Sequence, residues 1–115
     1  MTQIDAARAG IITPEMEAVA AKEYRSAEEI RAGVAAGRIA IPANINHKNI
    51  SPEGVGEGLR TKVNVNLGIS GDLMDEEMEF EKVRIALELG AEGIMDLSNH
   101  GKTREFRKKL IGMAP

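Results

Sequence analysis

Two short segments carry side chains that could hold a heterocyclic substrate. Residues 62–68 read KVNVNLG, and Asn66 offers a carboxamide that can both donate and accept hydrogen bonds. Residues 94–98 read IMDLS and include Met95, whose flexible thioether fills irregular apolar gaps. From spacing alone, Asn66 suits either a ligand contact or a turn. Met95 suits either a ligand contact or a place in the core.

Asp96 and the histidines are the other candidates for chemistry. Asp96 could act as an acid or a base, but it alternates away from Met95, which favours a structural role in bonding backbone donors near Ser98. His47 and His100 are the only histidines, and without a neighbouring carboxylate pattern they make a weak metal site. We therefore assign no catalytic residue and no metal ligand, and keep a substrate-side role open for His100.

The candidate residues lie within a predicted strand–helix–strand unit at 61–98. Residues 61–67 alternate polar and apolar side chains with period 2, which is typical of a strand. Residues 75–89 show helical spacing, with acidic side chains in the first turn and Met78, Val83, Ala86, Leu87 and Leu89 on the apolar side. A second apolar run follows at 92–97. Two strands joined by a helix must be parallel, with a right-handed crossover.

The polar face of the first strand needs an explanation. Lys62, Asn64 and Asn66 share one face, although a parallel sheet is usually covered by apolar contacts on both sides. One interpretation is an exposed or edge strand. The other is a strand that lines a ligand cavity, as inside an α/β barrel, where chemistry gathers at the carboxyl ends of the strands. Those ends carry Asn66 and Met95 and would lie side by side.

The remaining elements follow from caps and breakers. The sequence predicts helices at 14–22, 27–36 and 102–110, and a short strand at 38–41. Thr13-Pro14 and the capping box of Ser26 with Glu29 mark the first two helix starts, and Gly90 marks the stop of the helix at 75–89. The expected apolar pairs are Ile30 with Val34 and Phe106 with Leu110. The cations of the last helix are expected to face solvent, three of them in its last turn: Arg104, Arg107, Lys108 and Lys109. Residues 1–12 are mixed and expected to be partly ordered, and residues 47–60 read as a loop. Its glycines at 54, 56 and 58 favour a flexible turn over a phosphate cradle. We divide the chain into helices, short strand and glycine-rich loop at 1–60, and a strand–helix–strand–helix part at 61–115.

Composition bounds the class of protein. The chain has 115 residues, a net charge of −3 and no cysteine. No basic stripe stands out, so nucleic acid is not an expected partner. No apolar run is long enough to span a membrane, and no signal-peptide pattern is present, so we expect a cytoplasmic location. Without cysteine, the chain cannot itself ligate an iron–sulfur cluster through thiolates.

The sequence resembles the phosphomethylpyrimidine synthase family of thiamine biosynthesis, the ThiC family. KVNVNLG (62–68) and IMDLS (94–98) carry the resemblance, and IPANINH (41–47) is a further specific phrase. ARAGIITPEME (7–17) and EGLRTKVN (57–64) extend it over nearly the whole chain. The resemblance implies the N-terminal segment and first two β/α units of a (β/α)8 barrel, an α/β fold that is incomplete on its own.

The resemblance also implies a function. Family members are radical enzymes that use S-adenosylmethionine and a [4Fe–4S] cluster. They convert 5-aminoimidazole ribonucleotide into 4-amino-5-hydroxymethyl-2-methylpyrimidine phosphate. Asn66 and Met95 match the family positions that hold this substrate. The family's divalent-metal (zinc) histidines and Cys-x2-Cys-x4-Cys motif would lie beyond Pro115, so no cofactor is expected on these residues.

Alternatives remain open on the sequence. Asn99-His100-Gly101 after MDLS departs from the family's commoner form, so the paralogue 5-hydroxybenzimidazole synthase, which uses the same substrate, is a second interpretation. The chain could be a fragment, one subunit of a split enzyme, or a non-catalytic module that binds the ribonucleotide or a partner chain. Its partner would be the missing C-terminal part or another copy, because an incomplete sheet exposes strand edges.

Overall fold

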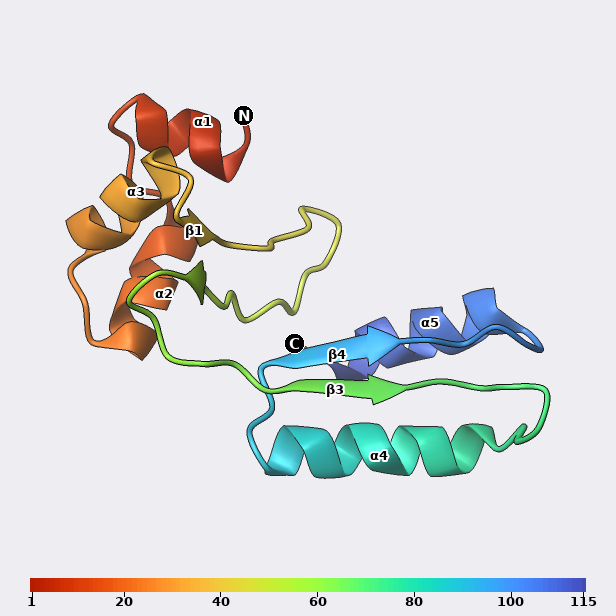
Figure 1. Cartoon of the computed structure of the whole chain (residues 1–115). Coiled ribbons are helices and arrows are strands. Elements are labelled where there is room, and N and C mark those ends of the chain that lie inside the picture. Colours follow the sequence, from red (N-terminus) through yellow and green to blue (C-terminus); the bar gives the residue numbers. More distant parts are fainter. The chain divides into compact units, whose positions relative to one another are not determined.

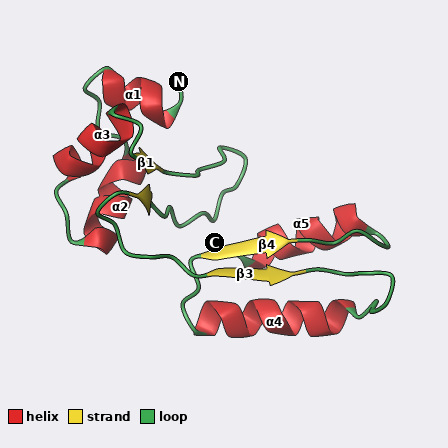
Figure 2. Ribbon diagram, in the orientation of Figure 1, coloured by secondary structure: helices red, strands yellow, loops and turns green.

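The chain folds into helices and two small sheets. A computed structural model describes all 115 residues, Met1–Pro115. The contacts divide it into two compact units, Met1–Thr61 and Lys62–Pro115. Figure 1 labels the elements of both units, and Figure 2 separates helices, strands and loops by colour. None of the helices contains an apolar stretch of the length that a membrane span requires.

Three helices build most of the first unit: α1 (Gln3–Arg8), α2 (Pro14–Glu23) and α3 (Ala27–Ala35). The predicted start signals of α2 and α3 are confirmed. The Thr13 hydroxyl accepts a bond from the Met16 amide at 3.3 Å. The Ser26 hydroxyl accepts from the Glu29 amide, and the Glu29 carboxylate accepts from the Ser26 amide. These bonds satisfy donors that a helix leaves unpaired at its first turn.

The ordered start of the chain was not predicted in full. Residues 3–8 form α1, which begins with a second capping box between Thr2 and Asp5. The usual sequence pattern of a capping box is Ser/Thr-x-x-Glu, and here the shorter Asp5 takes the place of the glutamate. The sequence signal for this helix start is therefore weak. The helix is further anchored by burial of Ala6 and Ala7.

The predicted loop at 47–60 contains a strand. β1 (Ile39–Ala40) pairs antiparallel with β2 (Val55–Gly56), so that Ile39 lies opposite Gly56. Gly56 has a φ of +151°, and a Cβ there would lie 2.1 Å from the Arg38 carbonyl oxygen. The glycine is needed for close approach of two backbones, which supports the structural interpretation of the glycine-rich segment rather than a phosphate cradle.

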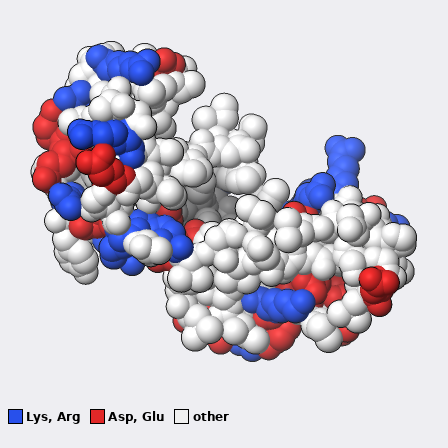
Figure 3. Space-filling model, viewed as in Figure 1, with Lys and Arg blue, Asp and Glu red and all other residues white.

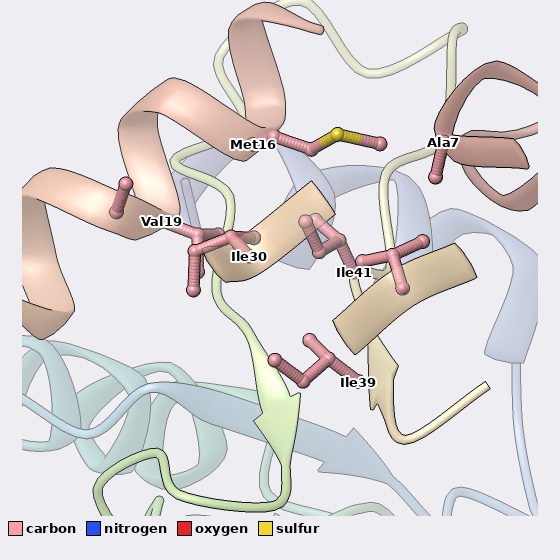
Figure 4. Close-up of a cluster of buried hydrophobic side chains, with 8 residues drawn as sticks. Ala7, Met16, Val19, Ile30, Ile39 and Ile41 are labelled. Carbon is pink, nitrogen blue, oxygen red and sulfur yellow. The ribbon is translucent and has the colours of Figure 1, made fainter. Parts of the chain in front are cut away.

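The first unit has an aliphatic core (Figure 4). Met16 and Val19 of α2 and Ile30 of α3 are fully enclosed. They pack with Ala7 from α1 and with side chains of the β1 segment. The predicted apolar pair of α3, Ile30 and Val34, is therefore confirmed as part of the core.

The second unit contains the predicted strand–helix–strand–helix. Its elements are β3 (Asn64–Leu67), α4 (Glu76–Glu88), β4 (Gly93–Asp96) and α5 (Thr103–Met113). The two strands are parallel, as predicted, and Figure 1 shows their arrows pointing the same way. Gly90 follows α4 with a φ of +76°, which suits the predicted stop.

One face of the β3–β4 sheet is covered by α4 and α5. Leu67 packs with Val83 of α4 and with Phe106 and Leu110 of α5. The rings of Phe80 and Phe106 lie 5.0 Å apart between their centroids, which is a favourable aromatic separation. The predicted pair Phe106 and Leu110 is confirmed.

Three details of these helices differ from the sequence prediction. Met78 and Leu89 are exposed, and the buried stripe of α4 instead runs through Glu79, Val83 and Ala86. α5 continues to Met113, so its cations do not lie in its last turn. Arg107, expected to face solvent freely, reaches back to Asp96 of β4.

Candidate functional site

Asn66 and Met95 lie opposite each other in the parallel register of β3 and β4. Partner residues in a parallel pair point to the same face of the sheet, so the two side chains stand next to each other. Both precede the end of their strand by one residue. The predicted meeting of the two carboxyl ends is therefore present in the structure.

The face that carries these two side chains is not covered within the unit. Asn66 is exposed, and half of the surface of Met95 is accessible to solvent. On the opposite face, Leu67 is buried beneath the helices. In Figure 3 the atoms over β3 and β4 belong mostly to uncharged residues, while charged side chains gather over α4. The surface suits a polar but uncharged ligand group beside an apolar one.

The Asn66 amide is oriented by its neighbour on the same face. Asn64 Nδ2 donates to Asn66 Oδ1 at 2.8 Å. This contact occupies one acceptor position and leaves the Asn66 Nδ2 group, with its two hydrogens, available as a donor. A heterocycle that presents an acceptor to this edge of the sheet would match it.

The turn directly after β3, which we call the β3 turn (Gly68–Ile69), is held by two buried side chains. Glu79 Oε2 accepts a hydrogen bond from the Gly68 amide at 2.8 Å. Ser98 Oγ accepts one from the Ile69 amide at 2.9 Å. The ladder also continues past the assigned strands, since the Leu97 amide donates to the Leu67 carbonyl at 2.7 Å. The carboxyl ends of the two strands are thus fixed to each other.

Asp96 has the structural role that its alternation predicts. Its Oδ1 accepts from the Ser98 amide at 2.8 Å, and its Oδ2 accepts from Arg107 Nε at 2.6 Å. Burial acts to raise the pKa of Asp96, but hydrogen bonds from Ser98 and Arg107 outweigh it and hold the pKa below its usual value. Asp96 therefore carries a negative charge at neutral pH and orients the segment that follows β4.

The loops after the two strands are neighbours. His100 Nδ1 lies 3.8 Å from the position that a Cβ would take at Gly71. This places His100 beside the loop that leaves β3, on the carboxyl side of the sheet. His47 belongs to the other unit, where it lines an open groove with apolar neighbours such as Ile41 and Ile50. No group of three or more His, Cys, Asp or Glu residues in the chain could hold a metal ion.

Sequence reasoning missed three residues that build this edge: Glu79, Ser98 and Arg107. Glu79 reads as one of several acids in the first turn of α4, where the helix dipole accounts for them. Its spacing to Val83 and Ala86 (i, i+4, i+7) is the signal that places it on the buried stripe. Ser98 and Arg107 gave no comparable signal, because a hydroxyl after a strand and an arginine on a basic helix are common on surfaces.

Comparison with known proteins identifies the family. The family model described as "Radical SAM ThiC family" matches residues 2–115. The chain belongs to this family. It is 61% identical over 114 residues to phosphomethylpyrimidine synthase of Clostridioides difficile (strain 630) and 63% identical to that of Alkaliphilus metalliredigens (strain QYMF). Phosphomethylpyrimidine synthase of Clostridium botulinum is 58% identical.

These alignments cover 99% of this chain but only 26% of each relative. The chain thus spans about a quarter of the length of the curated relatives it matches. The resemblance seen in the sequence is confirmed at the level of the family, and the matched residues include both β3 and β4.

Proposed function

We propose that this chain is the N-terminal part of an enzyme that converts 5-aminoimidazole ribonucleotide into the phosphorylated hydroxymethylpyrimidine of thiamine biosynthesis. The observation that supports this proposal most directly is the pairing of Asn66 with Met95. Their side chains share an uncovered sheet face at the carboxyl ends of two parallel strands. Ligands bind at that edge in α/β folds. Family membership and relatives named phosphomethylpyrimidine synthase support the choice of reaction.

Asn66 and Met95 are proposed as substrate contacts with distinct tasks. The free Nδ2 group of Asn66 donates to an acceptor of the ribonucleotide, and the Asn64 contact fixes which way that amide faces. Met95 offers a polarizable surface against which a flat heterocycle packs. Neither side chain exchanges a proton readily near neutral pH, so their contribution is binding and orientation of the substrate.

The β3–α4 and β4–α5 pairs are proposed as the first two units of a (β/α)8 barrel. Their parallel strands and the helices on one face agree with this arrangement. Two strands cannot close a barrel, so further strands must come from elsewhere. The rest of a longer polypeptide is the favoured source, and a second copy of the chain is the alternative. A cytoplasmic location is part of this proposal.

Cofactors are proposed to bind outside residues 1–115. The radical SAM family implies S-adenosylmethionine and an iron–sulfur cluster. This chain has no cysteine and no cluster of metal-ligating side chains, so its residues do not fit the [4Fe–4S] group or a divalent metal such as zinc. What these residues contribute is one side of the substrate site.

The test is ribonucleotide binding by the complete polypeptide that the gene encodes. Asn66→Ala should weaken binding of 5-aminoimidazole ribonucleotide about tenfold, because one hydrogen bond to the ligand is lost without a substitute. Asn46→Ala is a matched control, since Asn46 is exposed in the other unit. Unchanged affinity in Asn66→Ala, measured by calorimetry, would contradict the assignment.

Product analysis separates the thiamine enzyme from its paralogue. Both use the same ribonucleotide, but they release a pyrimidine phosphate or 5-hydroxybenzimidazole. The identity of 58–63% to phosphomethylpyrimidine synthases favours the pyrimidine. Mass spectrometry of the product from the reconstituted enzyme decides between them, and a binding module without activity would yield neither compound.

A further inference from the structure

Glu79 is a buried carboxylate in a position that the proposed function leaves unexplained. Only 3% of its surface is accessible, and a buried carboxylate is costly unless it is paired and hydrogen-bonded. Both needs are met here. Oε1 pairs with Lys82 Nζ at 2.5 Å, and Oε2 accepts from the Gly68 amide at 2.8 Å. The second bond connects the start of α4 to the β3 turn.

The backbone at the Gly68 end of this bond packs closely against the segment after β4. Gly68 has a φ of +148°, and a Cβ there would lie 2.5 Å from the Ser98 amide nitrogen and 2.7 Å from the Leu97 carbonyl carbon. The backbone of the β3 turn therefore lies directly against the segment that follows β4. Its amide points to the Glu79 carboxylate.

The Glu79 bond lies close to both proposed substrate contacts. Asn66 is two residues before Gly68, and Met95 is opposite Asn66 in the register. Leu67, between Asn66 and Gly68, is tied to β4 through the bond from the Leu97 amide. Release of the Gly68 amide would loosen the β3 turn, and with it the placement of Asn66 relative to Met95.

We infer that Glu79 is a positioning residue for the ribonucleotide site, acting through the Gly68 amide to hold Asn66 and Met95 in their binding geometry. This inference rests on the proposed function. It assigns Glu79 an effect on ligand affinity that exceeds its effect on folding, because the site needs both strand ends in one fixed arrangement.

The test compares three variants of the complete polypeptide. Glu79→Ala removes the acceptor for Gly68. Glu79→Gln keeps an oxygen acceptor but removes the charge that pairs with Lys82. Glu81→Ala is the matched control, since Glu81 lies on the same helix and is paired with Arg84 at an exposed position. Each is measured for affinity toward 5-aminoimidazole ribonucleotide, for thermal midpoint, and for hydrogen exchange over residues 64–73.

Glu79→Ala should bind the ribonucleotide about tenfold more weakly and exchange faster over residues 64–73, because a buried donor is left unsatisfied. Glu79→Gln should stay within about threefold of the wild type, and Glu81→Ala should match it. If Glu79→Ala does not fold, Glu79→Asp replaces it, with a carboxylate one methylene too short to reach Gly68 and the same expected loss.

Two results would overturn the inference, and they are distinguishable. Wild-type affinity in Glu79→Ala or Glu79→Asp, with Asn66→Ala still defective, would remove the positioning role and leave the proposed function intact. Absence of ribonucleotide binding by the wild type would remove the proposed function and the positioning role together. Equal losses in Glu79→Gln and Glu79→Ala would also contradict it, because the acceptor oxygen would then not be the relevant group.

Discussion

Asn66 of β3 and Met95 of β4 are register partners, and their side chains share the sheet face that α4 and α5 leave uncovered. The next pair along, Leu67 and Asp96, points the other way, and Leu67 is buried there. A shift of either strand by one residue would move Asn66 or Met95 to the helix side. Correct register is therefore a condition for this pair to act together.

Met95→Ala should reduce ribonucleotide affinity about three- to tenfold without a large change in stability. Met95 is half exposed within its unit, so truncation removes little buried surface from the fold but does remove the proposed ligand contact. Met78→Ala is the control, since Met78 is similarly exposed on α4. Calorimetric titration and thermal unfolding of both variants check this. A loss of stability greater in Met95→Ala than in Met78→Ala, with affinity unchanged, would indicate a core residue instead.

Phe106→Ala should destabilise the second unit by about 3–5 kcal/mol, the usual cost of emptying a phenylalanine site in a core. Phe106 is fully buried and touches the ring of Phe80. Phe80→Ala should cost less, because Phe80 is only partly buried and also lies at the surface below Lys109. Urea unfolding curves of the two variants give the difference in their free energies of unfolding. Equal costs for the two substitutions would be contrary to this packing.

Much of the fold could be predicted because local signals agreed with tertiary burial. Ser26 with Glu29 and Thr13 with Pro14 mark helix starts by chemistry that acts within four residues. Alternation at 61–67 placed Asn66 and Leu67 on opposite faces, and that separation is present. The parallel pairing of the strands followed from the intervening helix alone.

The parts that were missed depend on partners far along the chain. β2 consists of Val55 and Gly56 only, and it is a strand because β1 lies beside it, not because of its own composition. The burial of Glu79 depends on the Gly68 amide, eleven residues away, and could be noticed only as an acid on an apolar stripe. The Arg107–Asp96 pair joins α5 to β4 and has no periodic signature.

Stability should depend on pH through Asp96. The hydrogen bonds of Ser98 and Arg107 lower its folded-state pKa below the ordinary 3.8, so its contribution is fully present above about pH 4 and is lost as the pH falls through the folded value. Asp96→Asn should therefore be less stable than the wild type at pH 6, and the gap should narrow below pH 4. Urea unfolding of both proteins from pH 6 to below pH 4 measures this difference in stability. A gap that stays constant down to the lowest pH would show that Asp96 does not contribute through its charge.

Substitution by alanine should change the stability in opposite directions at two glycines, Gly56 and Gly112. Gly56→Ala should cost more than about 1 kcal/mol, because the new Cβ would meet the Arg38 carbonyl oxygen and the backbone holds a φ that alanine rarely adopts. Gly112→Ala should stabilise by a few tenths to about 1 kcal/mol, since Gly112 lies in α5 with open space around it and alanine favours the helix. Thermal unfolding of the two variants beside the wild type measures both signs. Stabilisation by Gly56→Ala would mean that β1 and β2 do not approach as closely as the register of Ile39 with Gly56 requires.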